Sequence, residues 1–267
     1  MSMYIKRTEV SSDKSPVILW DNILEDGTLT ASTEATNGAG ANAIDGNTYD
    51  YWIPTALPAT LEVDIGSSTS ASYAAIAAHT LGTDGNTLDV QYWNGAAWVS
   101  ALSSTITPTD DKTIIVAFTQ VSGTKWRISI SGGTVPNIGV VSIGDAIQFE
   151  SGILPAYTPL YMAEEIELLT SQTMNGQFVT NRVNRKGART QFGLNILDRS
   201  FVEGTAFQNF RNHYNDGKPF FFASNPSELT EDVAYCWRQD GGEIRPTFDS
   251  DGIFYKTQLS LEAYIGD

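Results

Sequence analysis

The stretch 198–223 constrains the fold most, because it is the one segment of the chain that reads as a helix. Ser200 and Glu203 have the spacing of a capping box, and Gly217 supplies a left-handed stop. Helical spacing places five residues on one apolar stripe: Val202, Ala206, Phe207, Phe210 and Tyr214. Three phenylalanines follow and predict a buried strand. A lone amphipathic helix among strands must cover a sheet, so this part is predicted to be a β-sandwich or split barrel with one helix at about 200–216.

Composition limits the classes of partner. The chain has 267 residues, room for two domains, and a formal net charge of −15. Such an acidic chain is not expected to bind nucleic acid by sequence or to adhere to anionic membranes, since those proteins neutralise phosphates with Lys and Arg. Cys236 is the single cysteine, which rules out an intramolecular disulfide and predicts a buried thiol. No apolar run reaches the ~20 residues of a membrane span, and no signal peptide is recognisable, so synthesis in the cytoplasm is expected.

Short alternating segments fill the first half of the chain and predict a β-sandwich. The clearest is 88–93, in which Leu88, Val90 and Tyr92 share one face and the intervening residues share the other. Asn94-Gly95 follows and predicts a two-residue hairpin turn. No helical pattern interrupts these strands, so the fold class predicted for the whole chain is mainly all-β, with one flanking α-helix.

Three linked motifs in this half resemble the galactose-binding-like jelly rolls of the discoidin, or coagulation factor 5/8 C-terminal, type. The loop 43–48, AIDGNT, is followed by Trp52, the strand 61–66 reads LEVDIG, and 92–98 reads YWNGAAW. The resemblance implies a jelly-roll sandwich related to carbohydrate-binding modules. In such modules, aromatic and charged residues in the loops at one end hold the sugar. The sequence identifies no such platform here, and Trp52 is expected to lie in the core.

The resemblance also implies a structural calcium ion in the early loop. Asp45 and Asn47 carry short oxygen-bearing side chains around a glycine, which suits a cation that prefers six to eight oxygen ligands. In the family a carboxylate near the end of the domain commonly completes the site, and Glu150 is the candidate here. The alternative is that Asp-Gly-Asn forms only a tight turn. No other cofactor is predicted.

Composition and prolines divide the chain into three parts. Residues 1–16 are predicted to be an N-terminal arm or strand that pairs with the last domain or reaches a neighbouring copy. Residues 17–155 form the first sandwich, and 156–267 form the second β domain after a proline-pinned linker. In that second domain, 177–182 and 190–197 are predicted to be the two strands of one hairpin.

The basic residues of the second domain gather in one cluster between these two predicted strands. It is proposed as an interface with an acidic partner subunit or a phosphate, the alternative being a solvated hairpin tip. The cluster consists of Arg182, Arg185, Lys186 and Arg189.

The order of hairpin, single helix, aromatic strand and closing hairpin resembles the tail-tube-like sandwich of tailed bacteriophages. The phrase DGKPFFFA after the helix is similar to small tail proteins. This resemblance implies a structural subunit of the tail tip, in the distal-tail or baseplate region. It would form a homo-oligomeric ring around the DNA channel, contact other tail proteins and be located in the virion tail, with host cytoplasm as its place of synthesis.

Two functions therefore follow from the sequence. The first is this ring subunit with a peripheral galactose-binding-like domain. The alternative is a carbohydrate-binding or host-adhesion module without a ring role, whose partner is a host-surface glycan. An enzyme is not predicted, because the chain has no nucleophile elbow, phosphate loop, HExxH or CxxC motif.

Overall fold

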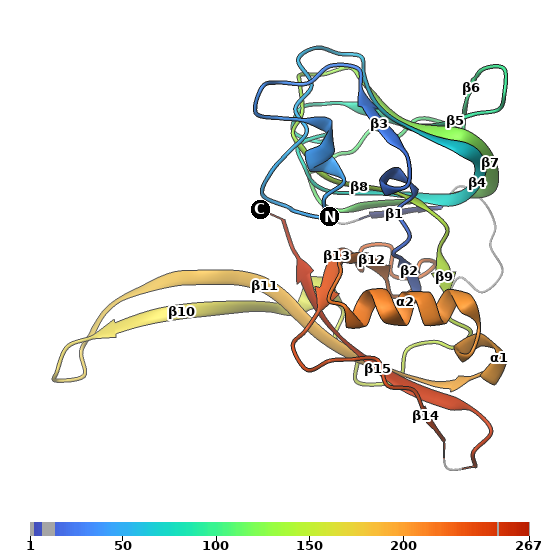
Figure 1. Cartoon of the computed structure of the whole chain (residues 1–267). Coiled ribbons are helices and arrows are strands. Elements are labelled where there is room, and N and C mark those ends of the chain that lie inside the picture. The colour runs from blue at the N-terminus through green and yellow to red at the C-terminus, as the bar shows by residue number, and fades with distance from the viewer. Residues whose placement is uncertain (1–2, 7–13, 250, 267) are drawn as a thin grey trace.

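The computed structural model describes residues 3–6, 14–249 and 251–266. Two β domains lie face to face, with a helix on the far side of the second and a long hairpin that projects from it (Figure 1). The predicted mainly β fold class with a flanking helical segment is confirmed, and the described strands form two sheets. Within the described residues, neither helix combines the length and the apolar character needed to cross a membrane.

The first sheet closes into a sandwich because its two longest strands run through both layers. β4 (Ala59–His79) and β7 (Ile114–Ser131) pair along both halves. In one layer they lie between β3 and β5, and in the other between β8 and β1. The other elements are β1 (Met3–Lys6), β3 (Thr28–Ala31), β5 (Thr87–Trp93), β6 (Trp98–Ser100), β8 (Ile138–Gly144), and the 3-10 helices η1 (Ile23–Glu25) and η2 (Gly40–Ala43).

A continuous apolar core fills the space between the two layers. Leu88 and Val90 are buried in it, as the alternation predicted, and Trp52 is fully buried with its indole nitrogen donating to Thr33 O. The expected two-residue turn is wrong: Asn94 opens a four-residue loop, and its side-chain oxygen accepts from two backbone amides within that loop.

The second sheet has strand order β10-β11-β15-β13-β12-β2-β9, with β14 on β15. Its strands are β2 (Val17–Leu19), β9 (Ile147–Gln148), β10 (Glu164–Gln172), β11 (Phe178–Leu197), β12 (Phe220–Ala223), β13 (Val233–Arg238), β14 (Thr247–Phe248) and β15 (Tyr255–Tyr264), and η3 (Leu160–Met162) precedes β10. The sequence assigned β2 and β9 to the first sandwich. In the structure they belong to the second sheet, where β2 pairs with β9 on one side and with β12 on the other. The first sandwich is therefore inserted between two neighbouring strands of the second sheet.

The helical segment is divided into α1 (Arg199–Val202) and α2 (Thr205–Asn215). The predicted capping box is wrong, because Gly204 interrupts the helix and Glu203 instead accepts from Arg199. The apolar stripe is confirmed at Val202, Phe207, Phe210 and Tyr214, which are buried against the sheet, whereas Ala206 is exposed. Gly217 has φ +76 and ends α2 as predicted.

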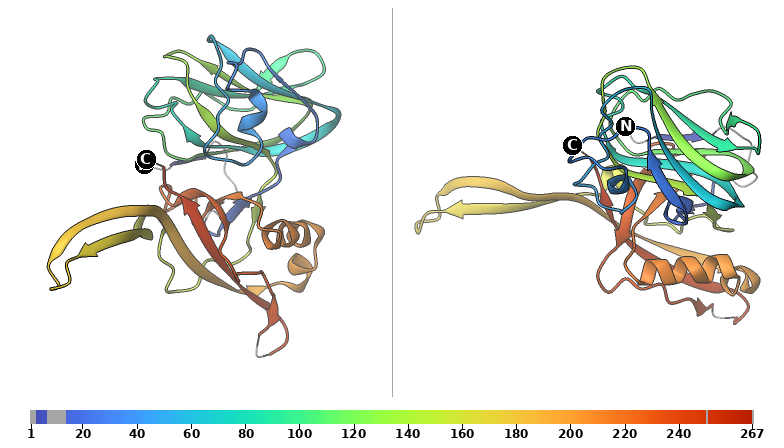
Figure 2. Two further views of the ribbon diagram at one scale, coloured as in Figure 1. Left: turned by 60° about the vertical axis from the view of Figure 1, so that its left-hand side comes forward. Right: turned by 45° about the horizontal axis from the view of Figure 1, so that its top comes forward.

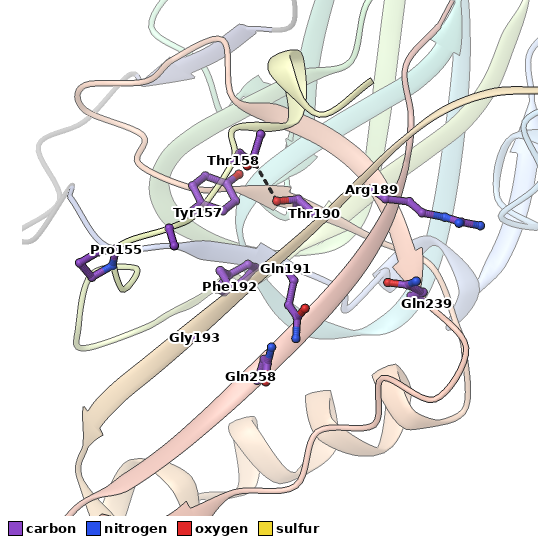
Figure 3. Close-up of a pocket in the computed structure, with 11 residues that line it drawn as sticks. Pro155, Tyr157, Thr158, Arg189, Thr190, Gln191, Phe192, Gly193, Gln239 and Gln258 are labelled. Carbon is purple, nitrogen blue, oxygen red and sulfur yellow. Dashed lines mark hydrogen bonds between the residues drawn. The ribbon is translucent and has the colours of Figure 1, made fainter. Parts of the chain in front are cut away.

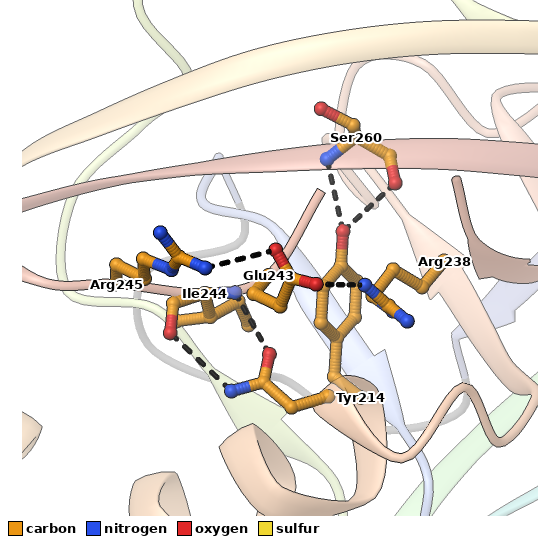
Figure 4. Close-up of polar contacts among 7 residues, drawn as sticks. Tyr214, Arg238, Glu243, Ile244, Arg245 and Ser260 are labelled. Atoms are coloured by element: carbon orange, nitrogen blue, oxygen red, sulfur yellow. Dashed lines mark hydrogen bonds and ion pairs between the residues drawn. The ribbon is translucent and has the colours of Figure 1, made fainter. Parts of the chain in front are cut away.

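Tyr214 connects the C-terminal end of α2 to strand β15 through hydrogen bonds (Figure 4). Its hydroxyl donates to Ser260 O at 2.8 Å and accepts from Ser260 N at 3.0 Å. Burial raises the pKa of Tyr214 to about 12. Beside it, Glu243 forms ion pairs with Arg238 and Arg245 at 2.8 and 3.4 Å. The helix is thus held by polar contacts as well as by its apolar stripe.

An apolar core distinct from those of the two domains joins the domains to each other. Even-numbered residues of β12 face α2, so Phe221 and Ala223 face the first sandwich. They pack with Tyr235 of β13 against Tyr73, Ala75 and other buried residues of β4, β7 and β8. Small alanines on β4 let the two sheets approach closely. The first sandwich is therefore packed on the second domain, not attached by a loose linker.

A buried carboxylate ties the interdomain linker to the second sheet. Asp232, which is fully buried, accepts from Tyr157 Oη at 2.7 Å, from Leu160 N at 2.6 Å and from Ser224 Oγ. Burial outweighs these hydrogen bonds and raises the pKa of the Asp232 carboxyl. Cys236 is also fully buried, as predicted, and burial raises the pKa of its thiol.

The long hairpin of β10 and β11 projects from the body of the molecule, as the views in Figure 2 show. The two strands pair from Glu164↔Ala188 to Gln172↔Phe178, and β11 joins β15 only from Ala188 onward. We call residues 164–187 the arm. The predicted hairpin of 177–182 and 190–197 is wrong, because both segments belong to the single strand β11. Its true partner, β10, precedes it in the chain.

Residues 1–16 are described only in part. β1 pairs in parallel with β7, so this strand joins the first sandwich and not the last domain as one expectation held. Residues 7–13 lie outside the described part of the chain.

Candidate functional site

The outward face of the first sandwich carries a group of aromatic and polar side chains on β5, β6 and β7. The alternation that buries Leu88 and Val90 turns Asp89, Gln91 and Trp93 outward. Trp98 lies opposite Trp93 across the β5–β6 pair, and Arg127 lies opposite Gln91 on β7. We call these five residues, Asp89, Gln91, Trp93, Trp98 and Arg127, the aromatic–arginine surface.

Side-chain contacts fix the geometry of this surface. The Arg127 guanidinium carbon lies 4.1 Å from the centroid of the Trp98 ring, and Trp93 meets Trp98 edge-on with centroids 5.7 Å apart. Arg127 Nε donates to Gln91 Oε1 at 2.7 Å, and Gln91 Nε2 donates to Asp89 Oδ2 at 2.7 Å. Each side chain is therefore held by a neighbour, so the surface is pre-organised.

The surface still has free hydrogen-bonding capacity. Within the described part of the chain, the two terminal nitrogens of Arg127 have no hydrogen-bond partner, and the residue is partly exposed. Next to it Lys125 is paired with Asp64 at 2.6 Å, and that hydrogen bond raises the pKa of Lys125 and lowers the pKa of Asp64. The neighbouring charges are thus compensated, and Arg127 is left to present donors to solvent.

This arrangement is absent from the sequence-based prediction of the site. The outward position of Trp93 was visible in the alternation, and Trp98 follows the same turn. Arg127 is 29 residues beyond Trp98, and only the β5–β7 register brings it over that ring.

The residues predicted as calcium ligands have hydrogen-bond partners within the protein. Both carboxylate oxygens of Asp45 accept from Asn47, through its backbone and side-chain nitrogens at 2.8 and 3.0 Å. Gly46 O accepts from Tyr235 Oη at 2.8 Å, so the second domain uses this loop carbonyl. Glu150 accepts from Asp198 N, at the start of α1. Among the described residues, no three His, Cys, Asp or Glu side chains gather as metal ligands. Asp45 and Asn47 thus form an Asx-type turn, and a structural calcium ion in this loop stays a prediction.

Removal of metal ions with a chelator tests whether the loop 43–48 binds calcium. We expect the melting temperature to be unchanged by excess EDTA, because the Asp45 oxygens and the Gly46 carbonyl already have protein partners. Differential scanning calorimetry with EDTA and with added Ca²⁺ measures this. A fall in melting temperature with EDTA that Ca²⁺ restores would contradict it.

The basic cluster is divided by the structure. Arg182 and Lys186 are exposed on the arm, whereas Arg189 forms ion pairs with Glu165 and Glu262 at 3.0 and 2.9 Å. The side chain of Arg185 lies outside the described part of the chain. The cluster lies along a strand and not at a hairpin tip, and its role as an interface stays a prediction.

The arm itself exposes an unusual number of large apolar side chains. Each is at least 45% exposed: Ile166, Leu168, Leu169, Met174, Phe178, Val179 and Val183. In the described chain, residues 178–187 of β11 pair with β10 alone, and β10 has no second neighbour. An isolated two-stranded ribbon is only marginally stable in water, and open apolar edges are templates for pairing.

Residues 42–128 match the model of a family described as the NedA-like, galactose-binding domain of the F5/F8 type C group. The match supports the predicted galactose-binding-like domain within the first sandwich. No curated protein matches the chain.

Solved carbohydrate-binding modules are similar to about half of the chain. The family 32 module of C. perfringens NanJ in complex with galactose is 20% identical, over 49% of this chain and 99% of that one, with a TM-score of 0.39. A chitosan-binding module of a Paenibacillus sp. IK-5 chitosanase/glucanase is 18% identical, over 46% and 98%, with a TM-score of 0.38. The family 32 module of AlyQ in complex with 4,5-unsaturated mannuronic acid is 22% identical, over 47% and 96%, with a TM-score of 0.37.

Proposed function

We propose that the chain is a non-catalytic carbohydrate-binding protein whose first sandwich holds a sugar on the aromatic–arginine surface. The observation that carries the proposal is the pre-organised set of two tryptophans and one arginine on the outward face of a domain that matches a galactose-binding family. A host-surface glycan is the proposed ligand.

The chemistry of the surface suits a sugar ring. A pyranose has an apolar C–H face, which packs on an indole, and a rim of hydroxyls that donate and accept hydrogen bonds. Trp93 and Trp98 supply the indoles. Arg127 supplies free donors, and Gln91 and Asp89 supply acceptors beside it. The carboxylate of the surface, Asp89, already accepts hydrogen bonds from Gln91 and Ser100, so binding without turnover is the proposed activity.

Replacing Trp98 by alanine is expected to weaken glycan binding about tenfold or more, because an aromatic contact and the support of Arg127 are lost together. A glycan array identifies the ligand, and isothermal titration calorimetry with that glycan measures the affinity. Tyr49→Ala is the matched control, since Tyr49 is 77% exposed on a loop outside the surface. Wild-type affinity in Trp98→Ala, or a comparable loss in Tyr49→Ala, would contradict the proposed location.

The second candidate function is an oligomer-forming structural subunit, such as a ring subunit of a phage tail tip located in the virion. The observation that favours it is the arm. Its apolar residues have no covering core, and its strands differ in charge: β10 carries Glu164, Glu165 and Glu167, whereas β11 carries Arg182 and Lys186. We propose that β10 of one copy pairs with β11 of the next, which would propagate head to tail and close as a ring. The carbohydrate surface would then be displayed in several copies.

The oligomeric state tests the arm. We expect wild type to be an oligomer, with a mass at least twice that of one chain. We expect Leu168→Asp/Val183→Asp to be monomeric, because these cross-strand partners are half-exposed on the arm. Ile253→Asp is the control, since Ile253 is 63% exposed outside the arm. Mass photometry measures all three. A monomeric wild type, or an oligomer that survives the double substitution, would contradict the pairing.

A further inference from the structure

A groove on the second domain has a chemistry that the first sandwich does not explain (Figure 3). It has a volume of about 490 Å³ and lies between the linker 155–158 and strands β11 and β15. Its polar lining is formed by Gln191 on β11, Gln258 on β15 and Gln239 at the end of β13. We call it the amide groove.

The three glutamine side chains lie on the solvent side of the groove, where Gln191 and Gln258 are exposed and Gln239 is partly buried. In the part of the chain that the structure describes, none of their amides has a hydrogen-bond partner, although each can donate twice and accept twice. In Figure 3 the Gln191 amide is turned toward Gln258, and the register places these two residues diagonally on neighbouring strands. The Gln191 and Gln258 amides therefore lie near each other in the groove, and Gln239 lines it from the end of β13.

The opposite wall of the groove is rigid. Thr158 O accepts from Thr190 Oγ1 at 2.7 Å, Leu154 N donates to Gly193 O at 3.0 Å, and the Tyr157 hydroxyl is held by Asp232. Gly193 permits this close approach, because a Cβ there would lie 3.0 Å from Leu154 Cδ1. Ala156 at the rim has φ +77, a left-handed conformation that costs about 1 kcal/mol or more in a non-glycine residue. The groove is thus pre-formed around a strained rim.

Charge and backbone pairing narrow the class of ligand. Arg189, the charged residue of the lining, is neutralised by Glu165 and Glu262, so the groove offers no net charge to an ionic ligand. A peptide cannot add as a strand, because Gly193 O is taken by the linker and β11 is paired with β15 along the floor. Recognition must therefore run through neutral amides, which match the hydroxyls of an uncharged sugar.

We infer that the amide groove is a second binding site for a short neutral oligosaccharide, on the second domain and independent of the aromatic–arginine surface. Gln191, Gln239 and Gln258 hydrogen-bond the sugar hydroxyls, and the linker 155–158 forms the wall against which the sugar lies. The inference goes beyond the proposed function, which concerns the first sandwich alone.

The test follows the glutamine side-chain amides by NMR during titration with a panel of neutral trisaccharides, maltotriose and cellotriose among them. We expect the amide signals of all three glutamines to shift with at least one probe. Gln191→Ala/Gln258→Ala should weaken that binding about tenfold or more, since two hydrogen bonds are lost. Gln177→Ala, an exposed glutamine on the arm, should bind as wild type.

Trp98→Ala separates this site from the proposed function. Binding at the amide groove should be unchanged in Trp98→Ala, whereas binding at the aromatic–arginine surface should be lost. Unshifted glutamine amides across the panel, or wild-type affinity of the double variant, would overturn the inference. Loss of the amide-groove shifts in Trp98→Ala would also overturn it, because the two sites would then be one.

Discussion

Replacing Asp232 by alanine is expected to lower the free energy of unfolding by about 3–5 kcal/mol. Three buried donors, on Tyr157, Leu160 and Ser224, lose their acceptor together, and each unsatisfied buried group costs about 1–3 kcal/mol. Chemical denaturation followed by circular dichroism measures the change. Asp240→Ala, which removes an exposed carboxylate a few residues away, should change stability by less than about 0.5 kcal/mol. Equal stabilities for the two variants would show that the linker is not tied through Asp232.

The Asp232 carboxyl also makes the free energy of unfolding depend on pH, and the direction of that dependence follows from its raised pKa. Burial raises the pKa of Asp232 above its ordinary value of 3.8, so the folded protein binds this proton more tightly than the unfolded chain does. The free energy of unfolding should therefore fall as pH rises from about 3.8 through the raised folded pKa. Asp232→Asn cannot titrate and should lose this part of the slope. An unchanged slope in Asp232→Asn would contradict the raised pKa.

Replacing Phe207 by alanine is expected to lower the free energy of unfolding by about 3–5 kcal/mol, the usual cost of truncating a buried phenylalanine. Phe207 is 1% exposed and lies between Phe201 and Phe149, with ring centroids at 5.5 and 6.3 Å. The loss would remove the contact between α2 and Phe149, the residue that follows β9. Thermal and urea unfolding measure it.

Asn209→Ala is the matched control for Phe207→Ala, because it lies on the exposed side of α2. It should leave stability within about 0.5 kcal/mol of wild type. If Phe207→Ala unfolds at the same urea concentration as Asn209→Ala, the placement of the helix stripe in the core is wrong.

Local periodicity made much of the fold predictable. The alternation at 88–93 correctly separates buried Leu88 and Val90 from outward Gln91 and Trp93, and the helical stripe correctly identifies Phe207. In both cases the signal lies within about ten residues, and burial of one face is the only requirement. Gly217 was equally readable, because the left-handed conformation that ends α2 favours glycine.

Pairing between strands that are far apart in the sequence could not be predicted from local periodicity. Val17–Leu19 is buried on both faces, so its unbroken apolar run does not tell which sheet it joins. The arm was wrongly predicted for a different reason, which is that its sequence looks like that of a buried strand. Leu168 and Val183 have the composition of core residues, and nothing local reveals that no core covers them. Arg127 could not be assigned to the site, because its position over Trp98 depends on a strand register and not on a motif.

The insertion of the first sandwich through β2 and β9 has a mechanical consequence. Tension on residues 20–146 would pass to two chain connections, β2 and β9, that lie side by side in one sheet. The apolar layer around Phe221 and Tyr73 opposes rotation of the first sandwich relative to the second domain. Force on the first sandwich is therefore transmitted directly to the second sheet. Domains strung on a single linker would extend and reorient before they transmitted any force. Here tension on the first sandwich should reach the second sheet, from which the arm projects, without such a reorientation.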